Sequence, residues 1–146
     1  MPTPYESGQL LLKLFELRRD PLLREGRNWY IRGFFPKSAA DVIAAVRGPD
    51  SAKFRMVIGY WDMAASLVTN QAIDAKMFHD ANPEMLPTFA KIHPFIAEIR
   101  EMLGSPHYIK HIESVVLAMP DAEERLALFA RQFVTMEKRL KSPQPA

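Results

Sequence analysis

The segment FRMVIGYWDMAASLV, residues 54–68, is apolar on nearly every face of the helix that its length and composition predict. A helix that is hydrophobic all round belongs in the middle of a bundle. Gly59, Ala64 and Ala65 are small enough to allow close backbone approach, and the neighbouring aromatic and Met side chains fill irregular space. We therefore predict a central buried helix over 51–69 in an all-α fold.

Prolines and capping residues indicate where the other helices begin. Asp20-Pro21, Asn82-Pro83 and Ser105-Pro106 each place a capping side chain directly before a proline, which loses nothing at the first helical position. Ser38 and Asp121 begin sequences that resemble capping boxes. Together with three- and four-residue apolar spacing, these signals predict helices at 7–19, 21–33, 38–47, 51–69, 72–80, 83–103, 106–119 and 121–140.

Two of the predicted helices carry long apolar stripes. In helix 83–103, Lys91, Glu98 and Arg100 lie outside the apolar stripe. Pro94 should kink that helix, because proline removes a backbone hydrogen bond. Helix 121–140 has a narrow seam of the kind used in bundle packing. We predict an irregular bundle of seven to eight helices, with a single domain over 1–141 and a frayed tail over 142–146.

Composition excludes several classes of protein. The 146 residues contain no cysteine, which excludes disulfides, thiol catalysis and Cys-ligated metals. No apolar run approaches ~18 residues, so no membrane span is expected, and the N-terminal MPTPYESG lacks a signal-peptide pattern. The six glycines form neither a phosphate loop nor a dinucleotide motif, and no serine lies in a nucleophile elbow. We expect a cytoplasmic protein without a cofactor, and because no catalytic motif is found we favour a protein that is not an enzyme over the enzymatic alternative given below.

Asp62 is the polar residue that fits this core least. An ionised carboxylate buried without a partner is very costly, so Asp62 must be paired, protonated or directed toward a pocket. In the favoured interpretation it meets an arginine, tyrosine or histidine of another helix and sets the register of the two helices. In the alternative it lines a small-molecule pocket together with Tyr60 and Trp61.

Two further patterns are weaker candidates for a site. His107 and His111 lie four residues apart, on one face of the predicted helix 106–119. A metal site needs a third ligand, which His79 or His93 could supply only through tertiary proximity. The segment 18–37 interleaves basic and aromatic residues, as single-strand nucleic-acid surfaces do. It is equally the composition of an amphipathic helix whose aromatics enter the core, and a net charge of +2 does not favour a polyanionic partner.

From Arg55 to Ser114 the chain resembles an uncharacterised family of small bacterial all-helical proteins. The likeness is carried by FRMVIGYWDMAASLV, by AIDAKMF and by KIHPFIAEIREMLGSP. The resemblance implies an all-helical fold and a bacterial cytoplasmic origin, and it implies no activity or cofactor. Arg100, beside Glu101 after the predicted kink, is the polar residue of the resemblance that we add to the candidate ligand-binding set.

The favoured functional hypothesis is a non-enzymatic helical module that acts through a protein partner or through self-association as a homodimer. It depends on the many predicted helices and on the absence of a catalytic, metal-binding or nucleotide-binding motif. It also depends on the aromatic hinge Gly33-Phe34-Phe35-Pro36, which would form an interaction patch if exposed. The alternative is a small-molecule-binding or enzymatic domain with a pocket near Tyr60, Trp61 and Asp62. Nucleic-acid binding through 18–37 comes third.

Overall fold

The computed structural model describes residues 1–142 and has an all-α fold over them, as predicted. The elements are α1 (Pro4–Arg18), α2 (Pro21–Gly33), α3 (Ala39–Arg47), α4 (Ser51–Thr69), α5 (Ala75–Ala81), α6 (Met85–Ala90), η1 (His93–Phe95), α7 (Ile96–Leu103), α8 (Lys110–Leu117) and α9 (Ala122–Lys141). The predicted tail lies outside the described residues except for Ser142, whose backbone N–H donates to the carbonyl of Lys138 (3.0 Å).

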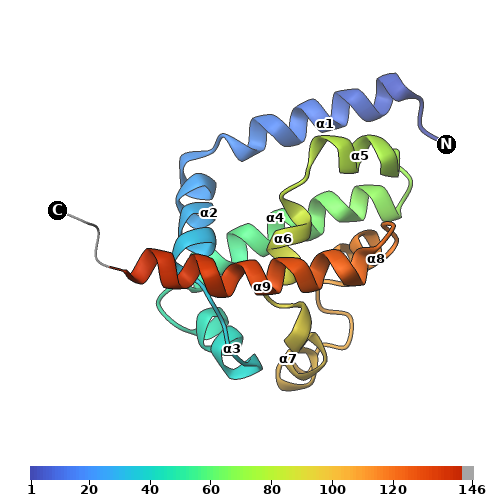
Figure 1. The fold of residues 1–146 in the computed structure, drawn as a ribbon. Coiled ribbons are helices and arrows are strands. Elements are labelled where there is room, and N and C mark those ends of the chain that lie inside the picture. The colour runs from blue at the N-terminus through green and yellow to red at the C-terminus, as the bar shows by residue number, and fades with distance from the viewer. Residues whose placement is uncertain (143–146) are drawn as a thin grey trace.

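Helix α4 runs through the middle of the molecule, with α9 crossing on one side of it and α1 at the edge (Figure 1). It packs mainly against α2 and α8, while α3 packs on α7 and α4, and α6 on α9 and α8. Residues 1–142 contain no helix that is both long and apolar enough to cross a membrane.

The central helix is buried on most, but not all, of its faces. Trp61 is 1% exposed, and Ala64 and Ala65 are fully buried. However, Met56 and Met63 are 38% and 40% exposed, and Gly59 is exposed with nothing near the position that a Cβ would take. The expectation of burial all round was therefore wrong for this face, because the stripe of apolar residues there faces no other helix.

The close helix approach expected at Gly59 occurs instead at Gly26 of α2. A Cβ added to Gly26 would lie 3.3 Å from the backbone oxygen of Lys53 and 3.4 Å from a methyl group of Val57. Gly26 thus allows α2 to approach the first turns of α4, and this contact anchors α2 against the core.

Two of the predicted caps form as expected. Asp20 accepts hydrogen bonds from the backbone N–H groups of Leu22 and Leu23, and Ser38 accepts one from Asp41. The three other signals behave differently. Asn82 ends α5, Ser105-Pro106 precedes a turn rather than a helix, and Asp121 makes no side-chain capping bond.

The predicted helix 83–103 is broken rather than kinked. Pro94 has no N–H to donate to the carbonyl of Ala90, and the chain makes the 3₁₀ turn η1 between α6 and α7. The apolar stripe survives the break, because Phe89, Ile92 and Ile99 are all fully buried. The break places Lys91 at the C-terminal cap of α6, and Lys91 is only 6% exposed, contrary to its predicted place off the stripe.

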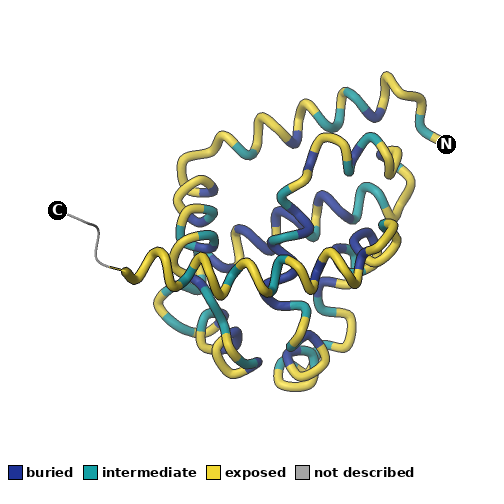
Figure 2. Tube along the Cα trace, in the orientation of Figure 1, coloured by how far each residue is buried: buried dark blue, intermediate teal, exposed yellow. Residues whose placement is uncertain are grey.

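Helix α9 is buried at its start and exposed toward its end (Figure 2). On its inner face Ala122 and Leu126 are buried, Phe129 and Phe133 are half-buried, and Met136 and Leu140 are 37% and 45% exposed. The second half of this seam therefore extends beyond the helices that would cover it.

Candidate functional site

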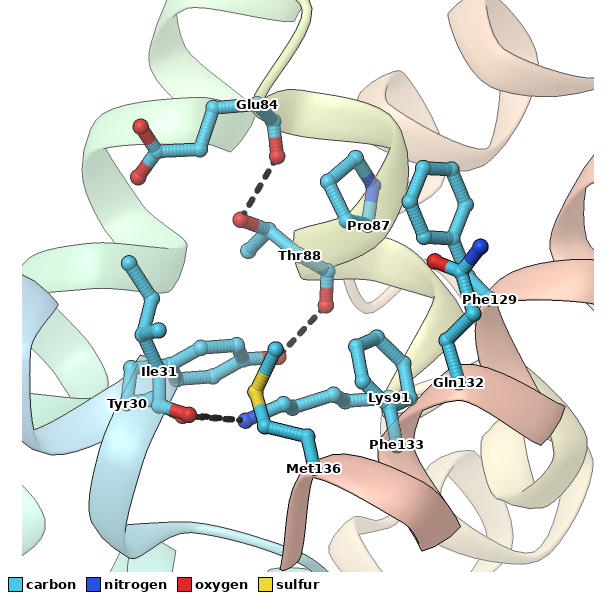
Figure 3. A pocket seen from close by; sticks show the side chains of 10 residues that line it. All are labelled: Tyr30, Ile31, Glu84, Pro87, Thr88, Lys91, Phe129, Gln132, Phe133 and Met136. Atoms are coloured by element: carbon cyan, nitrogen blue, oxygen red, sulfur yellow. Dashed lines mark hydrogen bonds between the residues drawn. The ribbon is translucent and has the colours of Figure 1, made fainter. Parts of the chain in front are cut away.

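A cavity of about 180 Å³ lies between α2, α6 and α9. Figure 3 shows side chains from all three helices converging on it. Its lining is mostly apolar and consists of Tyr30, Ile31, Glu84, Pro87, Thr88, Lys91, Phe129, Gln132, Phe133 and Met136.

The buried Lys91 is the most unusual residue of this cavity. Its Nζ donates hydrogen bonds to the backbone carbonyls of Tyr30 (2.5 Å), Ile31 (3.1 Å) and Phe34 (2.7 Å). The last carbonyls of an α-helix have no partner within the helix, and a lysine can supply one. Lys91 therefore caps the C-terminus of α2 from a different helix, where a positive charge also complements the helix dipole.

Aromatic rings surround the ammonium group of Lys91. Nζ lies 4.1 Å from the ring centroid of Phe35, 5.2 Å from that of Phe133 and 5.3 Å from that of Tyr30. Burial lowers the pKa of Lys91 to about 7, and Glu137 acts in the opposite direction. An amine of low pKa is a type of nucleophile, but here the carbonyls engage all three N–H donors of the ammonium, so the arrangement is that of a helix cap.

Two other polar groups of the cavity, the Tyr30 hydroxyl and the Glu84 carboxylate, are also satisfied within the fold. The hydroxyl of Tyr30 donates to the carbonyl of Thr88 (2.6 Å), and burial raises the pKa of Tyr30 well above its ordinary value. Glu84, at the rim, pairs with Arg18 (2.7 Å) and Arg27 (2.5 Å), so that one carboxylate joins α1, α2 and the start of α6.

A second cavity, of about 260 Å³, lies on the opposite side of Phe133. Phe133 and Lys91 line both cavities, and the second is completed by Phe35, Pro36, Lys37, Ala90, Pro94, Phe95, Ala130 and Val134. Helix α9 thus crosses an apolar surface and leaves empty space on both sides of one of its main contacts.

Tyr60 and Trp61, two of the predicted ligand-binding residues, face α1. The Tyr60 hydroxyl donates to the carbonyl of Leu14 (2.8 Å), and the guanidinium of Arg18 lies 5.3 Å from the centroid of the Trp61 ring. Burial raises the pKa of Tyr60 to about 12. These contacts fix α1 on α4, and a ligand-binding role for the pair stays a prediction.

Asp62 and Arg100, the other two predicted ligand-binding residues, each bind the chain near the start of α8. The half-buried Asp62 accepts a hydrogen bond from the backbone N–H of Ile112 (3.1 Å), and Arg100 donates to the carbonyl of Tyr108 (3.0 Å). The buried Ile109, which directly precedes α8, has a φ of +48°, a strained conformation for a β-branched residue. Asp62 is therefore paired, but its donor is a backbone amide and not the predicted arginine, tyrosine or histidine side chain.

The two histidines do not share a helix face, because α8 begins at Lys110. His107 lies exposed in the preceding turn, while Nδ1 of His111 is 2.7 Å from the Thr69 hydroxyl. Within residues 1–142, no group of three or more His, Asp or Glu side chains is placed to hold a metal ion.

Three of the four aromatic residues of the basic segment 18–37 pack in or against the core. Tyr30 and Phe34 are 1% and 6% exposed, and Trp29 stacks on Phe34 with ring centroids 5.1 Å apart. Arg18 and Arg27 are engaged by Glu84. These contacts fit the amphipathic-helix interpretation. Because Phe34 is buried, the aromatic hinge is not the exposed patch on which the interaction hypothesis first depended.

Lys91 and the two cavities were not predicted from the sequence. The one available signal was a lysine flanked by apolar residues in LPTFAKIHPFI, three residues before Pro94. The apolar periodicity placed Lys91 off the buried stripe, because it was read through one continuous helix over 83–103. The structure breaks that helix into α6, η1 and α7.

Comparisons with known proteins give a family but no activity. No curated protein and no solved structure is similar enough to the chain to be matched. A model of a domain of unknown function, DUF4760, matches residues 5–119. This range extends from the second residue of α1 to beyond α8 and includes the segment from Arg55 to Ser114 that carried the resemblance. The chain therefore belongs to the DUF4760 family.

Proposed function

We propose that this protein is a non-enzymatic interaction module, in which α9 covers a groove that a helix of a protein partner can occupy. The groove is the apolar surface of α2, α6 and η1 that lies under α9 and contains both cavities. The observation that carries this proposal is the incomplete packing of α9. Its Phe129 and Phe133 are only half-buried, and empty space remains on both sides of Phe133.

Incomplete packing matters because it lowers the free energy needed to displace α9. Interiors are normally close-packed, and a void costs its lining the contacts that a neighbour would make. Local opening requires little energy where few apolar contacts must be broken. The family match ends at residue 119, before α9 begins, so α1 to α8 form the part of the chain that the family shares.

The charges of the groove indicate the chemistry of the partner. Lys37 at the rim pairs with Glu137 of α9, and Lys91 lies beneath Phe133. Helix α9 thus shows what the groove accepts: two aromatic residues four positions apart, followed four positions later by a carboxylate. We expect the partner helix to have the same pattern, because a helix presents residues spaced by four on one face.

Regulation follows from competition for one surface. The partner binds only when α9 is displaced, so its apparent affinity is reduced by the fraction of molecules in which the groove is covered. Any change that weakens α9 docking should therefore tighten partner binding without altering the groove itself.

A labelled peptide tests this proposal. A fluorescent peptide of residues 121–142 stands for the partner helix, and its binding to the full-length chain is followed by anisotropy. We expect binding to full-length Phe133→Ala to be roughly tenfold or more tighter than to wild type, because the substitution weakens the competing α9 of the same chain. Glu137→Gln, which removes the ion pair with Lys37, is the milder second variant.

The matched control is the same peptide with both Phe129 and Phe133 replaced by alanine, which should not bind. Circular dichroism verifies that each chain is folded. If the unmodified peptide shows no saturable binding to Phe133→Ala or to Glu137→Gln, or if the alanine peptide binds equally well, the groove is not a helix-binding site.

Self-association through the same groove is a second candidate, since α9 of a second copy carries the identical seam. Asp121, between α8 and α9, has a φ of +57° and follows Pro120, which makes this junction a short strained hinge. Such hinges favour domain swapping. Light scattering should show twice the chain mass for wild type and a monomer for Asp121→Gly, in which the strain is relieved. A monomeric wild type at every concentration would exclude this candidate.

A bacterial cytoplasmic location remains part of the proposal, and the likeness to small bacterial proteins supports it. Cell fractionation would test it. The ligand site at Tyr60, Trp61, Asp62 and Arg100 and the nucleic-acid surface over 18–37 remain weaker hypotheses, because the contacts described above already engage these four side chains and the aromatic rings of that segment.

A further inference from the structure

We propose that the cavity between α2, α6 and α9 is a binding site for a small neutral apolar molecule about the size of one aromatic ring, and that its occupation holds α9 in place. This inference goes beyond the proposed function, because partner binding and ligand binding use different states of the molecule. The existence of the ligand site does not depend on the proposed function. Only the effect of the ligand on partner binding rests on that function.

The size of the cavity supports a ligand of this class. Its volume is about 180 Å³. An enclosed apolar cavity of roughly 150 Å³ binds benzene, because water finds no partners on such walls. The cavity here has a similar volume and is partly open to solvent. Aromatic and aliphatic side chains contribute most of the lining, among them Ile31, Pro87, Phe129 and Met136.

The hydrogen bonds around the cavity indicate that the ligand is neutral. An anion would need a free donor at the buried end of the cavity. There the three N–H groups of Lys91 already donate to backbone carbonyls and the Tyr30 hydroxyl donates to Thr88, while Gln132 lies at the exposed side. Desolvating a charged ligand without a partner costs far more than an apolar contact returns. The site should therefore discriminate against a carboxylate attached to an otherwise suitable ring.

The position of α9 links this ligand to the groove. Phe129, Phe133 and Met136 of α9 form one wall, so the cavity exists only while α9 is docked. A ligand that binds one of two states stabilises that state by mass action. The apolar ligand and the partner helix should consequently oppose one another, and the ligand acts as a negative regulator of partner binding.

Toluene is the test ligand and benzoate is the charged control with the same ring. On the full-length protein, toluene at about ten times its Kd should raise the Tm by about 3–5 °C, and benzoate should leave the Tm unchanged. Ile31→Phe, or Met136→Trp if the first variant does not fold, fills the cavity and should abolish the toluene effect. Ala130→Leu, at the second cavity only, should retain it.

Thiol labelling separates the site from its coupling to α9. In full-length Leu126→Cys, toluene at the same concentration should slow modification of the α9 thiol by about tenfold, the factor expected for a ligand of the docked state alone. The site is overturned if toluene does not raise the Tm of wild type. It is also overturned if toluene raises the Tm of Ile31→Phe, or of its substitute Met136→Trp, as much as that of Ala130→Leu. A toluene-dependent Tm with unchanged labelling retains the site and overturns the coupling. If the thiol of Leu126→Cys reacts no faster than a thiol in the core, such as that of Ala64→Cys, α9 does not open locally. That result contradicts the proposed function and not the ligand site.

Discussion

At the scale of single residues, Lys91 shows how a buried cation can be a structural element rather than a catalytic one. Burial disfavours its ammonium form, while three carbonyls at the end of α2 favour that form because only an ammonium has three N–H donors. Desolvation and capping therefore act on Lys91 in opposite directions. Its contribution to the free energy of unfolding should consequently depend on pH.

The first prediction concerns Lys91→Met. Loss of the ammonium leaves three carbonyls at a helix end without their donor, and we expect the free energy of unfolding to decrease by about 1–3 kcal/mol. Urea denaturation at pH 7 measures it. Lys138→Met, at an exposed position of α9, is the control and should change the value by less than about 0.5 kcal/mol. Equal stability of Lys91→Met and wild type would contradict the capping role.

The second prediction concerns the pH dependence of the same pair of proteins. The folded pKa of Lys91 is lowered to about 7 from an ordinary 10.5, so between these values the unfolded chain binds the proton more tightly than the folded chain does. The free energy of unfolding of wild type, relative to Lys91→Met, should therefore rise as pH increases from 7 to 10. Denaturation curves of both proteins across this range test it, and a constant difference would show that the pKa of Lys91 is not lowered.

The third prediction concerns Asp62. Its carboxylate accepts from the N–H of Ile112 in the first turn of α8, where a negative charge also suits the helix dipole. Asp62→Ala should lower the free energy of unfolding by about 0.5–2 kcal/mol, and Asp62→Asn, which keeps an acceptor, by less. Chemical denaturation measures both. If Asp62→Ala were neutral in stability, the role of Asp62 would have to be sought in a ligand after all.

At the scale of elements, glycine has a different packing role in each of two neighbouring helices, α2 and α4. Gly59 of α4 is exposed, and a methyl group added there would have no atom within 4 Å, whereas one added at Gly26 of α2 would lie 3.3 Å from the backbone of Lys53. Helix propensity alone would favour alanine at both sites. The packing of α2 on α4 decides between them.

The fourth prediction follows from this pair. Gly59→Ala should raise the free energy of unfolding by about 0.5–1 kcal/mol, since alanine loses less backbone entropy on folding. Gly26→Ala should give no gain or a loss, because a rigid backbone oxygen opposes the added methyl group. Thermal and urea denaturation of the two variants, measured side by side, check the difference; a stabilising Gly26→Ala would show that α2 and α4 are not in close contact.

At the scale of the whole molecule, the fold divides into a tightly buried centre and a loosely covered surface. The rings of Phe54, Phe78 and Phe89 are fully buried, whereas the inner face of α9 becomes exposed from Met136 onward. Stability is rarely uniform across such a structure. We expect α9 to open without unfolding of the centre, and this expectation is independent of which partner occupies the groove.

The fifth prediction compares two introduced thiols in a chain that has no cysteine of its own. Leu126 of α9 and Ala64 of α4 are both buried, at 3% and 0% exposure. The thiol of Leu126→Cys should react at least tenfold faster than that of Ala64→Cys, with a weaker dependence on urea, because local opening exposes less surface than global unfolding. Equal rates and equal urea dependence would show that α9 belongs to one cooperative unit with the core.

The all-α class and the approximate positions of most helices could be predicted from the amino-acid sequence. Local signals suffice for these features, because apolar periodicity and caps such as Asp20 and Ser38 act over a few residues. The tertiary structure alone decided the site. Lys91 caps carbonyls that lie up to 61 residues away, and the cavity needs three helices to meet. No local pattern encodes such contacts, since they depend on where Pro94 breaks a helix and on how far α9 extends past its support.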